Sequence, residues 1–445
     1  MVTKKQLWIN LISFSILPVT VFSVTPYPAP FTQAITLLQN TTMWWIIKAT
    51  ILFFLLYFNR PFYDTKNRGN MRVVQFYLLW NVVSFIHGLF VAEIYWDWKG
   101  LINNTMALML PLVAFTATNK MLVQSILSFY VRYTLPLTAV FVFIISTDAQ
   151  GFYLVPVSFL MLFFPVLTNR WKMVVMAFTL FVLLVDLDAR SNVIKFGVPF
   201  ILIFVYYFKK YITPRLMEIV RVVLIVLPVI LFALGVSGIF NVFRMNEYIG
   251  GKQEIVKMNN KGEVEEVNLK ADTRTFLYVE VLYSAKKFDI WWFGRSPARG
   301  NLSEEFGKED ETGRGERLTN EVAILNVFTW TGIVGLVLYL LVFYRASFLA
   351  VNRSNNIFSK TLGLFVAFRW LYSWVEDVND FSLNYYMLWI MIGLCFSRSF
   401  RHMTDKEVAA WVRGIFNFNR QKMTRGKPVE ARTDGLPVEL AERNS

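Results

Sequence analysis

Long, nearly uninterrupted apolar runs recur along the whole chain, and they constrain the fold more than any other feature. Each run approaches the roughly 20 residues that a helix needs to cross about 30 Å of hydrocarbon. Apolar residues make up 55% of the 445 positions and charged residues only 17%, so lipid is the expected solvent for most of the chain. We expect spans at residues 7–25, 43–58, 73–96, 101–118, 133–147, 151–168, 172–187, 193–208, 220–240, 321–343, 357–375 and 384–397.

The runs predict helices and not a closed barrel. Backbone polar groups inside hydrocarbon must be paired within the protein, and barrel strands would show alternating segments of about ten residues, which the sequence lacks. We therefore expect an all-α polytopic membrane protein with about 12 transmembrane helices and one large loop between the ninth and the tenth. Residues 121–132 fit either an interfacial helix or part of a longer span, because Arg132 interrupts the run.

The formal net charge of +14 predicts membrane topology here and not nucleic-acid binding. Most basic residues lie in short connections between the runs, as is typical of cytoplasmic loops. The first run follows Lys4 and Lys5 and lacks a small-residue cleavage pattern, so we expect a retained first span with its amino end inside. Both termini are then cytoplasmic. The predicted organisation is 1–240 with nine spans, 241–320 as a far-side loop, 321–397 with three spans and 398–445 as a basic cytoplasmic tail.

The far-side loop has its own predicted secondary structure. It carries 13 basic and 14 acidic residues between positions 241 and 320, so it is not a simple polybasic surface for anionic lipid. Residues 254–258 and 263–267 flank Asn259-Asn260-Lys261-Gly262, which predicts a β-hairpin with a turn-forming tip. Residues 273–285 are predicted to be helical. The apolar stripe expected on this helix is Phe276, Val279, Leu282 and Tyr283.

The tail from Arg398 interleaves basic residues with apolar ones, among them Trp411, Ile415, Phe416 and Phe418. A basic segment with apolar side chains beside a span binds anionic lipid through both kinds of residue. We therefore expect this segment to lie on the inner leaflet.

Motifs typical of soluble enzymes are absent from the sequence. It has no Gly-rich phosphate loop and only two histidines, His87 and His402, and its single Cys395 excludes an intramolecular disulfide. A metal site built on His ligands is not expected, and we expect no cofactor. His87 and Glu93 lie in the third run and are weaker candidates, because a packed, hydrogen-bonded histidine is the more ordinary interpretation.

The candidates for chemistry are arginines at the outer ends of spans and in the loop. They are Arg190, Arg274, Arg295, Arg317 and Arg369. An arginine at the centre of a transmembrane helix costs about 2.5 to 3.5 kcal/mol of insertion energy, and less near an end, so something should compensate. One explanation is a local ion pair, of Arg190 with Asp186 or Asp188, and of Arg369 with the carboxylates at 376–380. The other is contact with an anion, because a guanidinium binds phosphate oxygens in pairs.

Three short motifs stand in a characteristic order. The first is Ala189-Arg190-Ser191 at the outer end of a mid-chain span. The second is Arg274, which opens a loop helix and is followed some twenty residues later by Phe293-Gly294-Arg295. The third is Thr319-Asn320-Glu321, which leads into a span that contains Gly332-Ile333-Val334-Gly335. In order and spacing, across roughly residues 150–397, they resemble the O-antigen polymerase and O-antigen ligase superfamily of bacterial surface-polysaccharide assembly.

This resemblance implies a GT-C-like, metal-independent membrane glycosyltransferase of the bacterial inner membrane. It would transfer a growing glycan, as in lipopolysaccharide or exopolysaccharide, from undecaprenyl pyrophosphate to a lipid-linked repeat unit on the periplasmic face. The implied partners are the undecaprenyl pyrophosphate-linked oligosaccharide, membrane lipids and a chain-length regulator. The leaving group is a lipid pyrophosphate, whose developing charge needs stabilisation. The implied roles are a pyrophosphate clamp of Arg190 and Arg274, helpers at Arg295, Arg317 and Arg369, and a general base at Glu321 or Glu376.

Two alternatives stay open. The ligase branch places a His before the Asn where this chain has Thr319, which favours a polymerase over a ligase acting on a lipid or protein acceptor and leaves the base unassigned. A polysaccharide or lipid transporter without covalent chemistry is the other alternative. No repeat of six spans is visible in the sequence, and this counts against a transporter built from two halves.

Overall fold

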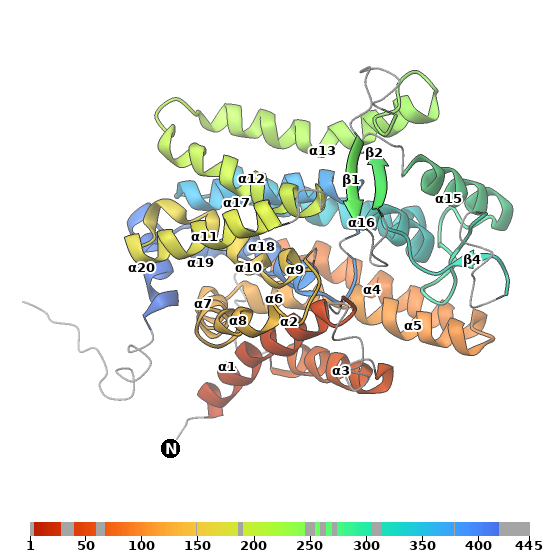
Figure 1. Cartoon of the computed structure of the whole chain (residues 1–445), viewed down its shortest axis with the longest axis horizontal. Helices are drawn as coiled ribbons and strands as arrows, with labels where there is room; N and C mark the ends of the chain where they lie inside the picture. Colours follow the sequence, from red (N-terminus) through yellow and green to blue (C-terminus); the bar gives the residue numbers. More distant parts are fainter. Residues whose placement is uncertain are drawn as a thin grey trace, which may run out of the picture.

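The computed structural model of the chain is mostly helical (Figure 1). It describes residues 4–27, 40–58, 67–147, 149–185, 190–244, 254–258, 264–268, 274–304, 313–377 and 379–417. The first part of the chain forms α1 (Lys4–Phe14), α2 (Ile16–Val24), α3 (Thr41–Phe58), α4 (Arg68–Val91), α5 (Tyr95–Leu108), α6 (Leu112–Ala117) and α7 (Lys120–Phe129). The middle forms α8 (Thr138–Phe141), α9 (Gln150–Tyr153), α10 (Val155–Met161), α11 (Asn169–Val185), α12 (Arg190–Tyr207) and α13 (Pro214–Val236).

The rest of the chain holds the loop and the last spans. The strands are β1 (Glu254–Met258), β2 (Val264–Asn268), β3 (Asn301–Leu302) and β4 (Glu316–Arg317), paired antiparallel as β1-β2 and β3-β4. The helices are α15 (Thr275–Phe288), α16 (Ala323–Asn352), α17 (Ile357–Tyr372), α18 (Leu383–Phe396), α19 (Arg398–Arg401) and α20 (Asp405–Phe416). In Figure 1, α15 and β4 lie at one end of the bundle, and α19 and α20 lie at the other.

Several helices could cross a membrane, which supports an all-α membrane protein. Five of them are long and apolar enough by length and composition, namely Leu7–Val24, Arg68–Val91, Tyr95–Ala117, Pro214–Val236 and Ala323–Asn352. Large side chains on the outer faces of α4 are exposed, and Phe90 is 84% exposed, as expected where lipid replaces water. Shorter apolar helices are Thr41–Tyr57, Ser191–Tyr207 and Leu383–Phe396.

The count of twelve spans stays a prediction, because two of the expected runs do not form single long helices. Residues 133–147 and 151–168 form short helical pieces instead. Pro136, Pro156 and Pro165 lie in these pieces, and a proline inside a helix removes one hydrogen bond and clashes with the preceding turn. Residues 121–132 belong to a longer helical run, since α7 continues into a π-helix over Tyr130–Thr134 that contains Arg132.

The centre of the bundle is α18, whose 14 residues are all buried. A helix that is apolar on every side is stable in a protein core or in lipid, and the burial of α18 places it in the core. It packs against α6, α16 and α17, while α16 also packs against α4 and α13 against α17. Buried rings fill the space between these helices, with Tyr339 in contact with Tyr77 and Trp370.

The predicted loop structure is confirmed in part. The hairpin is present as β1 and β2, and the residues of its predicted tip lie outside the described residues. The predicted helix is present as α15, but the predicted apolar stripe is wrong. Leu277, Tyr278 and Val281 are buried, whereas Val279 and Tyr283 are exposed. The buried face of α15 is the one that carries Leu277 and Tyr278, because these residues pack against α16 and the apolar residues around it. The spacing of apolar residues within α15 does not reveal this tertiary contact.

The placement of the tail on the inner leaflet stays a prediction, but the apolar side chains of the tail that the structure describes pack on the helices. Trp411 and Ile415 on α20 are buried, and the ring of Phe416 lies 4.4 Å from that of Trp171. Trp411 Nε1 donates a hydrogen bond to the carbonyl of Lys120 at 2.8 Å. The amphipathic face of α20 therefore packs on the bundle and not on lipid. Phe418 lies outside the described residues.

Helix α16 is interrupted at Gly332, which has φ +66° and ψ −170°. The break leaves backbone N–H and C=O groups of α16 without partners in the helix, and the loop that precedes α16 forms hydrogen bonds with them. Ile333 N donates to the carbonyl of Trp291 at 2.8 Å, and Arg295 N donates to the carbonyl of Thr329 at 2.7 Å. Two of the motifs noted in the sequence, around Gly294 and Gly332, thus lie against each other through their backbones.

We expect Gly332→Ala to destabilise the folded protein. A Cβ at this position would lie 2.3 Å from the carbonyl oxygen of Trp292, and the backbone angles are ones that only glycine adopts readily. The strain alone should cost about 1–3 kcal/mol and lower the apparent melting temperature in detergent. Gly197→Ala in α12 is the matched control, because no atom lies within 4 Å of its added Cβ. Equal melting temperatures for the two variants would contradict this account.

Candidate functional site

A cavity of about 360 Å³ lies where the loop between α13 and α16 returns to the helices. It is bordered by the start of α15, the segment before α16, the connection between α17 and α18, and the ends of α2 and α9. The residues that line it are Ser23, Tyr27, Phe152, Arg274, Arg317, Thr319, Asn320, Glu321, Glu376, Asp377, Asp380, Ser382 and Asn384. Four of the predicted site residues, Arg274, Arg317, Glu321 and Glu376, therefore share one cavity.

Two arginines converge on one carboxylate in this cavity. Arg274 Nη1 lies 2.6 Å from Glu321 Oε2, and Arg317 Nη2 lies 3.1 Å from Glu321 Oε1. Arg274 immediately precedes α15, and its Nε donates to the carbonyl of Val375 at 3.2 Å. The hydroxyl of Tyr278, one helical turn on, donates to the carbonyl of Trp374. These two bonds fix the start of α15 against the α17–α18 connection and aim Arg274 at the cavity.

The opposite charge gathers on the α17–α18 connection. Glu376, Asp377 and Asp380 line the cavity there, and two buried lysines offset them. Lys195 on α12 is 3% exposed at its side chain, and its Nζ lies 3.6 Å from Glu376 Oε1. Lys48 on α3 is 6% exposed, and its ammonium lies 3.8 Å above the ring of Phe22.

Asp377 is held by amide donors. The backbone N–H of Asn379 donates to its Oδ1 at 2.9 Å, and the Nδ2 of Asn326 donates to the same atom at 3.4 Å. Burial, together with the charge of Asp380, raises the pKa of Asp377 to about 7. In the folded protein this carboxyl group therefore keeps its proton to a higher pH than a free aspartic acid does.

Arg369 on α17 lies below the cavity and does not line it. Its side chain is only 2% exposed, and its Nη2 donates to Asn384 Oδ1, a cavity atom, at 2.9 Å. It forms no ion pair with the described carboxylates at 376, 377 and 380, and its Nε has no hydrogen-bond partner among the described residues. The local ion pair considered from the sequence is therefore not formed at contact distance.

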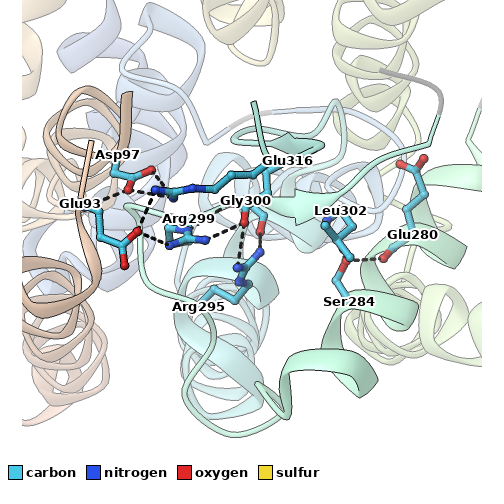
Figure 2. Close-up of polar contacts among 10 residues, drawn as sticks. Glu93, Asp97, Glu280, Ser284, Arg295, Arg299, Gly300, Leu302 and Glu316 are labelled. Atoms are coloured by element: carbon cyan, nitrogen blue, oxygen red, sulfur yellow. Dashed lines mark hydrogen bonds and ion pairs between the residues drawn. The ribbon is translucent and has the colours of Figure 1, made fainter. Parts of the chain in front are cut away.

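Arg295 is not among the residues that line the cavity, and Figure 2 shows it among the polar contacts of the loop. Its Nη1 donates to the carbonyl of Gly300 at 2.6 Å, its Nη2 lies 3.0 Å from Glu316 Oε1, and its guanidinium covers the ring of Phe288 at 3.8 Å. Arg299 also binds Glu316, at 2.8 Å. Arg295 thus stabilises the loop, and its position offers no contact with the cavity.

The same network ties the loop to the turn between α4 and α5, as Figure 2 shows for Glu93 and Asp97. Arg314 Nη2 lies 2.9 Å from Glu93 Oε2, and its Nη1 lies 3.1 Å from Asp97 Oδ2. Asp97 also accepts the backbone N–H of Glu93 at 2.9 Å. Glu93, a weak site candidate from the sequence, therefore serves as an anchor for the loop.

Arg190 is the first residue of α12, but its side chain lies outside the described residues, as do residues 186–189. The proposed pairing of Arg190 with Arg274 around one diphosphate stays a prediction. The neighbouring residue is placed, because the hydroxyl of Tyr372 donates to the carbonyl of Ser191 at 3.2 Å. The start of α12 therefore lies beside the end of α17, one helical turn from Lys195.

No family model, curated protein or solved structure matches the chain. The chemistry of the cavity therefore follows from its own residues. Among the residues that the structure describes, no group of three or more His, Cys, Asp or Glu side chains could hold a metal ion. The cavity offers charged groups, amides and aromatic rings.

Sequence reasoning missed several residues of the site. Lys48 and Lys195 stand inside apolar runs, and an ionisable residue inside a run is itself a signal of a functional site. Asn384 gave no comparable signal, because an asparagine at the end of a span is common, and Asn320 was noted only as part of the third motif. Their place in the cavity depends on how the loop folds back onto α17 and α18.

We expect the stability of the wild-type protein to fall more steeply with rising pH than that of Asp377→Asn. A carboxyl whose pKa is raised in the folded state favours folding while protonated, and this contribution is lost as pH rises from about 4, the unfolded pKa, to about 7. Asparagine keeps the Oδ1 acceptor and removes the titration. The difference in the free energy of unfolding between the wild type and Asp377→Asn should change by up to about 1.4 kcal/mol per pH unit in this window. Thermal or denaturant unfolding in detergent measures it. Parallel pH profiles would rule out this titration.

Proposed function

We propose that this chain is a membrane-embedded polysaccharide polymerase. It transfers a glycan from undecaprenyl pyrophosphate to a lipid-linked repeat unit on the periplasmic face of the bacterial inner membrane. The observation that supports this most is the convergence of Arg274 and Arg317 on Glu321 inside a polar cavity.

The arginine pair is suited to a diphosphate. Two guanidinium groups share one carboxylate, so the three side chains together carry one net positive charge. Glu321 is 50% exposed and can swing away when a stronger anion enters. Guanidinium forks bind phosphate oxygens in pairs, and preorganised cations at the leaving group stabilise the charge that develops as the glycosidic bond breaks. In this role Glu321 is a counter-ion and not the general base.

The remaining walls are suited to a carbohydrate. Asn320 and Asn384 supply amide groups, and the α17–α18 connection supplies carboxylates, which are hydrogen-bonding partners for sugar hydroxyls. Tyr27 and Phe152 line the same cavity with their ring centroids 5.3 Å apart, and such rings cover the apolar face of a sugar. The volume lies within the range of small-molecule sites.

The motifs that carry the family resemblance come together in space, which adds support. Arg274 of the second motif pairs with Glu321 of the third, and Gly294 of the second packs on the α16 break at Gly332. Ser191 of the first adjoins the end of α17. Thr319 lines the cavity in the place where the ligase branch has a His, and we therefore favour a polymerase.

We expect Arg274→Ala and Arg317→Ala to lower polymer formation by about 100-fold or more each, the usual loss when a preorganised donor to a developing anion is removed. The assay uses purified protein in proteoliposomes, with lipid-linked repeat units isolated from cells that lack the gene. Lys286→Ala, an exposed lysine on α15, is the matched control and should leave the rate unchanged. Wild-type rates in both arginine variants would reject the clamp.

The same assay separates the three functions. A ladder of lengthened lipid-linked chains marks a polymerase. Transfer of a finished glycan to a lipid or protein acceptor, with no lengthening, marks a ligase. Movement of the lipid-linked unit across the vesicle without a new glycosidic bond marks a transporter and would overturn the proposal.

A further inference from the structure

Three of the four carboxylates in the cavity are already engaged. Glu321 is held by two arginines, and Glu376 by a buried lysine. Asp377 accepts two hydrogen bonds from amide groups, those of Asn379 and Asn326. A group that takes a proton from a substrate must have a carboxylate oxygen open to that substrate. Both oxygens of Glu321 are in ion pairs, and Glu376 and Asp377 are half-buried as well as bound at one oxygen, so these three side chains meet this need less well than an exposed carboxylate does.

Asp380 is different. Its Oδ1 accepts one side-chain hydrogen bond, from the hydroxyl of Ser382 at 2.6 Å, and Ser382 is the one side chain among the described residues that donates to it. Ser382 also caps α18, because its Oγ accepts the backbone N–H of Tyr385 at 3.3 Å. The carboxylate of Asp380 is therefore fixed by a rigid helix start, while the residue remains exposed to the cavity.

The surroundings of Asp380 suit a group that changes its proton. The protein around it partly desolvates the carboxylate and raises its pKa, and the charges of Lys195 and Lys48 oppose that rise. Both lysines are nearly inaccessible to solvent. They favour the ionised carboxylate without covering it.

We infer that Asp380 is the general base that activates the acceptor hydroxyl. This rests on the proposed sugar transfer. The hydroxyl oxygen of the acceptor sugar forms a bond to the anomeric carbon of the donor, and the bond from that carbon to the phosphate oxygen breaks. The leaving undecaprenyl pyrophosphate keeps the electron pair of that bond, and the hydroxyl proton passes to Asp380. The proton then leaves to water, and the base is restored.

Other charged groups also bear on the pH dependence of this step. On the helices packed around the cavity these groups are Lys48 on α3, Lys195 on α12 and Arg369 on α17. Arg274, Arg317 and Glu321 face the cavity from the loop, and Glu376 and Asp377 face it from the α17–α18 connection that also carries Asp380. The group whose ionisation causes the rise of kcat with pH must therefore be identified with variants, because several ionisable groups lie close to Asp380.

The test compares Asp380→Asn with Asp289→Asn in the proteoliposome assay. Asparagine at 380 keeps the acceptor for Ser382 but cannot take a proton. Asp289 ends α15 outside the cavity with φ +50°, a conformation that asparagine also adopts readily, so it is a matched exchange. The readout is release of undecaprenyl pyrophosphate from isolated lipid-linked repeat units. We expect kcat of Asp380→Asn to fall by about 100-fold or more with KM unchanged, and Asp289→Asn to match the wild type.

The pH profile gives a second readout that a purely structural role would not move. The base must be ionised, so the wild-type kcat rises with pH through an acid limb. That limb should be absent from the residual rate of Asp380→Asn and present but displaced in Asp380→Glu, which retains a carboxylate on a longer side chain. If Asp380→Asn does not accumulate in the membrane, Asp380→Glu becomes the deciding variant. A kcat and a pH profile equal to those of the wild type in Asp380→Glu would then overturn the inference.

Failure of this inference and failure of the proposed function give different results. If the wild type releases no undecaprenyl pyrophosphate and lengthens no chain, the polymerase proposal itself fails. If the wild type lengthens chains and Asp380→Asn does so at the same kcat with the same acid limb, another group is the base and the polymerase proposal stands.

Discussion

The loop of this protein is held at the bundle by a requirement of backbone hydrogen bonding. A helix at membrane depth cannot leave its N–H and C=O groups without partners, yet α16 is interrupted at Gly332. The preceding loop supplies the missing partners through Trp291 and Arg295, and Trp80 Nε1 donates to the carbonyl of Thr331 at 2.8 Å. The position of the whole loop, and with it one wall of the cavity, depends on these hydrogen bonds to the interrupted helix.

Charge compensation then divides the arginines into two groups. Arg295, Arg299 and Arg314 are paired with Glu316, Glu93 and Asp97 in a network that joins the loop to the α4–α5 turn. Arg274 and Arg317 share a single carboxylate. The first group carries little spare charge and stabilises structure, whereas the second retains a net positive charge in a cavity. This difference divides the loop arginines more clearly than their positions in the sequence do.

The sequence predicted the class of fold and much of the site, for identifiable reasons. Apolar runs of sufficient length predict helices, and the β-hairpin and α15 followed from local turn and periodicity signals. Arg274 and Arg317 were singled out as arginines of the loop, and Glu321 and Glu376 as carboxylates beside spans whose role the family resemblance implies. The burial of α20 was not predictable, because an amphipathic helix can face lipid or protein equally well. Arg295 was misleading for a similar reason, since its partner Glu316 is 21 residues away and meets it only through the β3-β4 pairing.

The shared carboxylate also bears on how a reaction cycle would finish. A site built only of arginines would hold a spent diphosphate tightly, and product departure would then limit turnover. Glu321 is part of the protein and therefore always present at high effective concentration beside Arg274 and Arg317. In the proposed reaction it competes with the departing lipid pyrophosphate for the same guanidinium groups, so the resting ion pair is also what clears the site for the next donor.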